Sequence, residues 1–181
     1  NLFEIDGPLD LSFLMRFANS LPGYDNLRYE KLEPVYPREF DASDDMFEVI
    51  RQRDVLMYHP YESFEAVNDF VEQAAYDPDV LAIKQTPYRA GPQSPVVDAL
   101  VDAARAGKEV TVIIELMARF DEAANIRLPT RLQEAGAHVM YGVVGYKTHA
   151  KLIMVVRRES GKLRRYCHCG TGNYHPDTAR F

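Results

Sequence analysis

The chain has 181 residues, of which 46% are hydrophobic and 27% are charged, and its formal net charge is −6. This composition is typical of a soluble globular protein, and no apolar run reaches the roughly 20 residues that span a bilayer. The acidic balance argues against a general nucleic-acid binder, and residues 1–4 lack the basic start and apolar block of a secretory signal.

The first forty residues are irregular, because prolines interrupt short apolar groups. A helix is predicted over residues 9–21 with its apolar side chains inward. Residues 28–40 are expected to form an extended connector. Ser43 is the expected cap of a short helix that ends at Arg53.

From residue 54 onward the pattern alternates between strands and helices. Strands are predicted over residues 54–58, 80–86, 109–116 and 137–143, and helices over residues 64–74, 96–106 and 121–135. Two more strands, residues 148–157 and 163–169, are joined by a turn at Ser160-Gly161. We therefore expect an α/β fold with a mixed, mainly parallel sheet flanked by helices, preceded by an irregular helical segment.

The charge is unevenly distributed along the chain. Residues 1–80 hold 6 Lys and Arg against 18 Asp and Glu, whereas residues 81–181 hold 15 against 9. The densest basic stretch, residues 147–165, contains seven Lys and Arg, with Glu159 as its only acid. This stretch either steers a polyanion toward His149 or is a solvated hairpin with its charges outward; both interpretations stay open.

His149 and Lys151 lie two residues apart on a predicted strand, so their side chains are expected to share one face. After the next strand, the segment Gly170–Asn173 offers backbone N–H groups to an anion, with Thr171 and Asn173 as polar side chains. A neutral imidazole can attack phosphorus and hold it as phosphohistidine. A single histidine is more often structural, but these neighbours favour a phosphoryl-transfer site with His149 as the nucleophile.

Arg89 and Arg119 each follow a predicted strand, at the edge of the sheet where ligands bind in such folds. Their guanidinium groups suit bidentate recognition of phosphate oxygens, although Arg119 could instead form an ion pair with Asp121 or Glu122. Glu115 and Asp121 either pair with these arginines or hold Mg²⁺ through water, and the sequence leaves this undecided.

Cys167, His168, Cys169 and His175 suggest a zinc site at first sight. Their spacing matches no common structural zinc pattern, and the thiols fit the packing of a strand. A disulfide between residues two apart on one strand is geometrically awkward, so reduced thiols and a cytosolic location are expected. His59 is expected to be an ordinary histidine.

Four segments together resemble bacterial polyphosphate kinase of the large, histidine-phosphorylated type. They are IKQTPYR (residues 83–89), ELMARFDE (115–122), YGVVGYKTHAK (141–151) and GTGNY (170–174). Residues 5–8 and 59–64 resemble the same family, so that the likeness covers nearly the whole chain.

The resemblance implies a phospholipase D-like catalytic domain, the first of two in the carboxyl-terminal half of the family. Residues 43–181 would form this domain, truncated at its carboxyl end, and residues 1–42 a connector with part of the preceding domain. His149 would take the γ-phosphate of ATP and pass it reversibly to polyphosphate. Arg89 and Arg119 would hold the cofactor Mg²⁺ through the phosphates that carry it.

The chain departs from the family pattern at four places, none of them a proposed catalytic group; one is the pair Cys167 and Cys169, which replace aliphatic residues. Val156 occupies the position of an aspartate in the wider phospholipase D pattern, so either another group orients His149 or the acid is dispensable for a phosphoryl rather than a phosphodiester substrate. Pro87 replaces an apolar residue beside Arg89. Pro129 lies within a predicted helix, which we expect it to break or kink.

Two alternatives remain beside the kinase: a phospholipase D-like phosphodiesterase, and an assembly module that is inert in isolation. The expected partners are ATP or ADP, polyphosphate, the remaining domains of the same chain and, at full length, further copies of it, with no nucleic acid. A cytoplasmic location is expected, with peripheral attachment to the inner membrane as a second option at full length.

Overall fold

The computed structural model describes residues 4, 6–7, 11–41, 45–87, 94–114, 122–142 and 145–175, and in the helix 122–134 it describes side chains from residue 128 onward. The chain divides into two compact units, Asn1–Leu32 and Glu33–Phe181. In the described residues, no helix is both long and apolar enough to cross a membrane.

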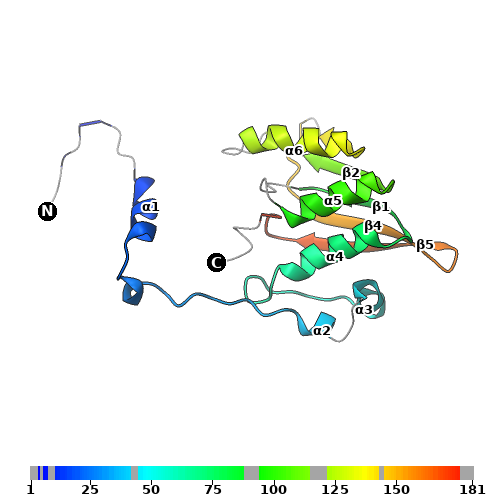
Figure 1. Cartoon of the computed structure of the whole chain (residues 1–181), viewed down its shortest axis with the longest axis horizontal. Coiled ribbons are helices and arrows are strands. Elements are labelled where there is room, and N and C mark those ends of the chain that lie inside the picture. The colour runs from blue at the N-terminus through cyan, green and yellow to red at the C-terminus, as the bar shows by residue number, and fades with distance from the viewer. Residues whose placement is uncertain are drawn as a thin grey trace. The chain divides into compact units, whose positions relative to one another are not determined.

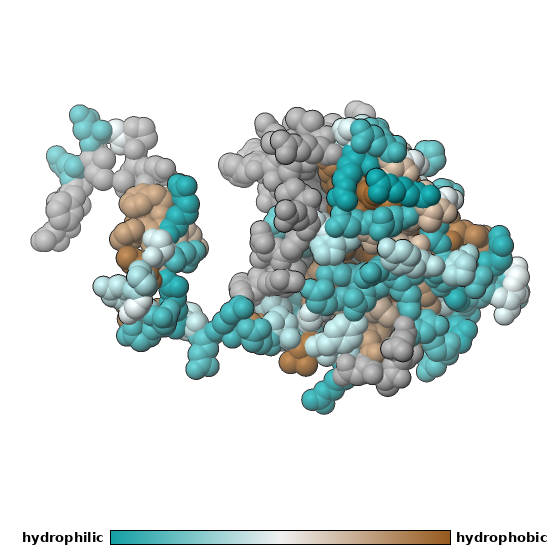
Figure 2. All heavy atoms as spheres, in the orientation of Figure 1, coloured by the Kyte–Doolittle hydropathy of each residue, from teal (hydrophilic) through white to brown (hydrophobic). Residues whose placement is uncertain are grey.

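The first unit contains helix α1 (Phe13–Ser20) and the short 3-10 helix η1 (Asp25–Leu27). The helix is shorter than predicted, and none of its residues is buried: Leu14 is 45% exposed and Phe17 is 53% exposed. Figure 2 shows the resulting apolar surface over α1 in brown. The prediction that these side chains point inward is wrong, because the described part of this small unit offers no second layer against which α1 can pack.

The second unit begins with the helices α2 (Arg38–Asp41), α3 (Met46–Gln52) and α4 (Glu65–Tyr76). Asp45 caps α3, because its side chain accepts a hydrogen bond of 3.1 Å from the backbone N–H of Glu48. The predicted cap was Ser43, which lies outside the described residues.

Five strands form one mixed sheet in the order β3-β2-β1-β4-β5 (Figure 1). Its strands are β1 (Val80–Gln85), β2 (Glu109–Ile114), β3 (His138–Tyr141), β4 (Lys151–Glu159) and β5 (Lys162–Gly170). Strand β2 pairs in parallel with β1 and β3, whereas β4 pairs antiparallel with β1 and β5. The predicted α/β class with a mixed sheet is confirmed, with parallel and antiparallel pairings in equal number.

Helices α4, α5 (Pro95–Arg105) and α6 (Glu122–Glu134) lie on one face of the sheet (Figure 1). The two crossovers β1-α5-β2 and β2-α6-β3 run in the same direction along the sheet, so their common right-handedness places both helices on one side. Ser94 and Pro95 begin α5 as predicted. Helix α6 continues through Pro129, so the proline does not break it, and the expected kink stays a prediction.

Residues 54–58 were predicted to form a strand but pair with no strand in the described chain. Their burial nevertheless alternates: residues 55 and 57 are partly buried, whereas 54, 56 and 58 are exposed. That period of two is typical of a strand with one face on a core. The prediction of a paired strand is therefore wrong here, although the segment keeps the burial pattern of one.

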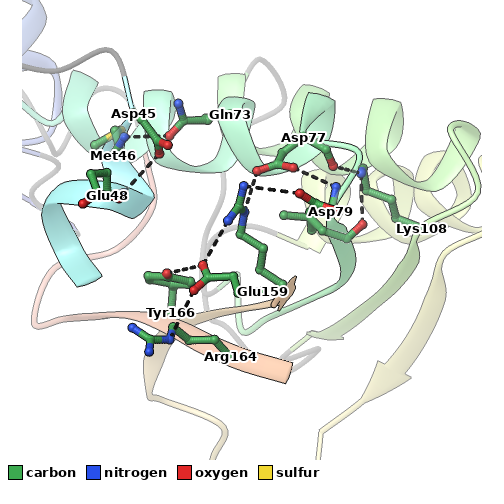
Figure 3. A network of polar contacts seen from close by, with 12 residues as sticks. Asp45, Met46, Glu48, Gln73, Asp77, Asp79, Lys108, Glu159, Arg164 and Tyr166 are labelled. Atoms are coloured by element: carbon green, nitrogen blue, oxygen red, sulfur yellow. Dashed lines mark hydrogen bonds and ion pairs between the residues drawn. The ribbon is translucent and has the colours of Figure 1, made fainter. Parts of the chain in front are cut away.

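Strand β4 ends in a polar network around Arg157, which is only 19% exposed (Figure 3). Its guanidinium donates to Asp77 at 2.8 Å and to Glu159 at 3.0 Å, and it lies over the ring of Phe47. The hydroxyl of Tyr166 on β5 also donates to Glu159. These contacts link the β4-β5 hairpin to the segment between α4 and β1.

Candidate active site

Lys151 opens β4 and is buried, with 6% of its surface exposed. Thr86, which directly follows β1, forms hydrogen bonds with the backbone on both sides of Lys151. Its hydroxyl donates to the carbonyl of Ala150 at 2.6 Å and accepts from the N–H of Leu152 at 3.0 Å. The position of the lysine is thus set by the register between the central strand β1 and β4.

His149 precedes β4 and is exposed, so the prediction that it lies on the strand is wrong. It remains beside Lys151, as expected: Nζ of the lysine is 3.2 Å from Nδ1 and 3.1 Å from Nε2 of the imidazole. Nζ also donates to the backbone carbonyl of His149 at 2.7 Å.

The two ring distances locate the ammonium relative to the imidazole. An atom in the ring plane that was 3.1–3.2 Å from both nitrogens would overlap a ring carbon. Nζ must therefore lie over the face of the ring. The contact is therefore a cation on a π-face rather than two hydrogen bonds. The lysine therefore does not block the in-plane approach to either imidazole nitrogen.

Gly170 lies directly opposite Lys151 in the β4-β5 ladder. The start of the predicted anion-binding segment is therefore adjacent to the lysine, as the sequence suggested. The side chains of Thr171 and Asn173 lie farther along, where they line a pocket of about 410 Å³ together with His59 and His168. The structure thus brings together His149, Lys151 and Gly170, and Gly170 also lines the pocket to which Thr171 and Asn173 belong.

His168 and Tyr174 form a polar pair beside this segment that the sequence interpretation missed. Nδ1 of His168 and the hydroxyl of Tyr174 are 2.9 Å apart, and Tyr174 is 1% exposed. Burial, and to a smaller extent the nearby His59, lower the pKa of His168 to about 4, so the ring is neutral at pH 7. The sequence did indicate where His168 lies: it precedes Gly170 by two residues, so both residues are on the same face of β5.

The packing of His168 against Gly170 leaves little room for a side chain at position 170. A Cβ at this position would lie 3.1 Å from Cε1 of His168, which is closer than ordinary van der Waals contact. We expect Gly170→Ala to displace the imidazole and lower the free energy of unfolding by about 1–3 kcal/mol, as overpacking does. Urea denaturation of the chain measures this loss.

Gly172→Ala is the matched control, since a Cβ there meets nothing within 4 Å. Equal stability of both variants would contradict the argument from close packing.

Two predicted phosphate-binding residues, Arg89 and Arg119, lie outside the described residues, as do Glu115 and Asp121. Val156, where the wider pattern has an aspartate, pairs with Ala82 and Arg165. Because it is five residues from Lys151 on the same strand, it faces the other side of the sheet. An acid at that position would not share a face with Lys151.

Comparison with known proteins identifies the family of the chain. The family model "Polyphosphate kinase C-terminal domain 1" matches residues 45–181. The chain is 57% identical over 180 residues to polyphosphate kinase of Xylella fastidiosa (strain 9a5c), covering 99% of this chain and 25% of the relative. With polyphosphate kinase of Pseudomonas aeruginosa it shares 54% over 179 residues, covering 99% and 26%.

A solved structure agrees with this assignment. The crystal structure of polyphosphate kinase from Porphyromonas gingivalis matches with a TM-score of 0.74 and 34% identity, over 88% of this chain and 27% of that chain. The chain thus spans about a quarter of the length of the relatives it matches. Together these matches confirm the resemblance found in the sequence: the chain belongs to the polyphosphate kinase family, and its residues 45–181 match C-terminal domain 1 of that family.

Proposed function

We propose that this chain is the nucleophile-bearing part of an enzyme that transfers the γ-phosphate of ATP reversibly to polyphosphate through a phosphohistidine at His149. The observation that carries the proposal is the contact between His149 and the buried ammonium of Lys151, opposite Gly170. The relatives of the same family, which are about four times as long, are named polyphosphate kinases. We call a polypeptide of that length containing this chain the full-length polypeptide.

In the proposed reaction a lone pair of the neutral His149 ring attacks the γ-phosphorus of ATP. The new N–P bond forms as the bond between the γ-phosphorus and the β,γ-bridging oxygen breaks, and ADP leaves with that electron pair. Lys151 stabilises the negative charge on the transferred oxygens, with the backbone N–H groups near Gly170 as further donors. Polyphosphate then takes the phosphoryl group from the imidazole by the same kind of displacement.

Arg89, Arg119, Thr171 and Asn173 complete the proposed binding of the phosphate chain. Guanidinium groups bind phosphate oxygens in bidentate fashion, and they cannot ligate a cation. In this proposal Mg²⁺ arrives on the phosphates, whose charge it neutralises.

The proposal is tested by labelling the full-length polypeptide with ATP that carries ³²P in its γ-phosphate. A phosphohistidine is labile to acid and stable to base, so the label should be lost in acid, and mass spectrometry should locate it on His149. Addition of ADP should remove it and regenerate ATP. Acid-stable label, or label on another residue, would disprove the phosphohistidine at His149.

A further inference from the structure

Gln85 is the last residue of β1, and its side chain is buried without a hydrogen-bond partner. The residue is 2% exposed. Neither Oε1 nor Nε2 has a partner in the part of the chain that the structure describes. A buried carboxamide without hydrogen bonds loses its contacts with water and gains nothing in return, so it lowers the stability of the fold. The amide of Gln85 therefore has no evident role in holding the fold together.

The strands beside Gln85 place apolar residues next to it. It pairs with Val112 on β2 and with Ile153 on β4, and both of these residues are fully buried. Lys151 lies two positions before Ile153 on β4 and therefore shares the face of the sheet on which Gln85 lies. Diagonal neighbours of this kind in an antiparallel pair have Cα atoms about 7–8 Å apart, a gap that long side chains can bridge. The amide of Gln85 is thus within reach of the ammonium that contacts His149.

The buried polar side chains are concentrated at this end of β1. Apart from tyrosines, the described chain has three buried polar or charged residues, Gln85, Ser94 and Lys151. Gln85 ends β1, Ser94 begins the helix that follows it, and Lys151 opens the antiparallel strand beside it. All three consequently lie at the carboxyl end of β1, the edge at which α/β sheets bind ligands. The location of Gln85, as well as its missing partner, points to a ligand.

We propose that Gln85 binds the phosphoryl group that is transferred, with Nε2 donating to a phosphate oxygen and Oε1 accepting from the ammonium of Lys151. This inference rests on the proposed function and adds one binding group to it. A carboxamide between a cation and an anion is oriented by both, because its oxygen is attracted to the cation and its N–H groups to the anion. Both polar atoms of the amide would then be satisfied together. Lys151 keeps its place over His149, and the flexible side chain of Gln85 makes the adjustment.

Gln85→Met tests whether the amide is free of structural partners, because methionine has a similar shape and no strong hydrogen-bonding group. In urea, without nucleotide or phosphate, the variant of the 181-residue chain should unfold at a higher urea concentration than the parent. Gln73→Met is the matched control. The amide oxygen of Gln73 accepts a hydrogen bond of 2.9 Å from the backbone N–H of Met46, so its loss should lower the unfolding midpoint. Opposite shifts in the two variants are the expected result.

Nucleotide binding by the full-length polypeptide tests whether the amide contacts the transferred group. The β,γ-imido analogue of ATP carries a γ-phosphate that is not transferred, and ADP carries none. In calorimetric titrations Gln85→Met should bind the analogue about tenfold more weakly than the parent does, because a hydrogen bond to a charged oxygen is lost. Its affinity for ADP should stay within about twofold of the parent, and Gln73→Met should bind both nucleotides as the parent does.

Three outcomes would overturn the proposal. A lower unfolding midpoint for Gln85→Met would mean that the amide has a structural partner within the chain. A higher midpoint with unchanged affinity for the ATP analogue would mean that the amide binds no phosphate. Equal weakening of ADP and of the analogue would place the contact elsewhere on the nucleotide. These measurements involve no phosphoryl transfer, so they are independent of whether the label appears on His149, which tests the proposed function.

Discussion

His149→Gln is expected to abolish phosphoryl transfer by the full-length polypeptide, with a fall of about 10⁴-fold or more in the rate of polyphosphate synthesis. Glutamine keeps a polar side chain of similar reach, but its amide has no basic lone pair with which to attack phosphorus. Since His149 is exposed, the substitution should leave the fold intact. The measurement is the initial rate of polyphosphate formation from ATP, together with the fraction of enzyme labelled.

His138→Gln is the matched control. His138 is an exposed histidine on β3, outside the proposed catalytic machinery. Its replacement should leave the rate within about twofold of the parent, in line with the small effect of surface substitutions. Retention of polyphosphate synthesis in His149→Gln would refute the assignment of the nucleophile.

Arg157→Met is expected to cost about 3–5 kcal/mol of the free energy of unfolding, because it removes the cation that two largely buried carboxylates share, although Glu159 keeps an ion pair with Arg164. Asp77 and Glu159 are each 12% exposed and both contact the guanidinium. Burial opposes the charge of Arg157, but its hydrogen bonds to Asp77 and Glu159 raise its pKa above the ordinary value. Urea denaturation of the 181-residue chain at pH 7 measures the loss.

Arg158→Met provides the comparison. Arg158 is the next residue of β4 and is exposed, so its replacement should change stability by less than about 0.5 kcal/mol. Similar losses of unfolding free energy in Arg157→Met and Arg158→Met would show that the network around Arg157 contributes no more to stability than an exposed arginine does.

The pH dependence of the same variants follows from Glu159. Burial tends to raise the pKa of this carboxyl, but hydrogen bonds from Tyr166 and Arg157 outweigh it and hold the pKa below 4.5. A lowered pKa means stability that is present above pH 4.5 and lost as the pH falls through the lower, folded-state pKa. The stability difference between the parent and Arg157→Met should therefore shrink below pH 4.5.

The sequence predicted those elements that local rules determine. Strand β1 and the start of α5 at Ser94-Pro95 lie where predicted, because alternation, capping and a proline at the first helical position are properties of a few neighbouring residues. The proximity of Lys151 to Gly170 was also predictable, since a short turn joins two strands of equal length and fixes their register.

The remaining features depend on groups that are distant in sequence. Residues 54–58 form no strand in the described chain because pairing needs a neighbour, and no local pattern reveals whether one is present. Arg157 belongs to a hairpin for which outward charges were a plausible interpretation, yet its partner Asp77 is 80 residues away. The pair of His168 and Tyr174 likewise requires that the chain turn back after Gly170, which the sequence does not specify.

The ammonium of Lys151 above the imidazole face has one more consequence. In the proposed reaction the attacking lone pair would lie in the ring plane, so the lysine and the incoming phosphorus would approach His149 along perpendicular directions and would not compete for one orbital. A phosphoryl group attached to a ring nitrogen would already have the ammonium of Lys151 beside it. Lys151 would therefore not have to change rotamer as the negative charge of that group moves from the substrate to the intermediate.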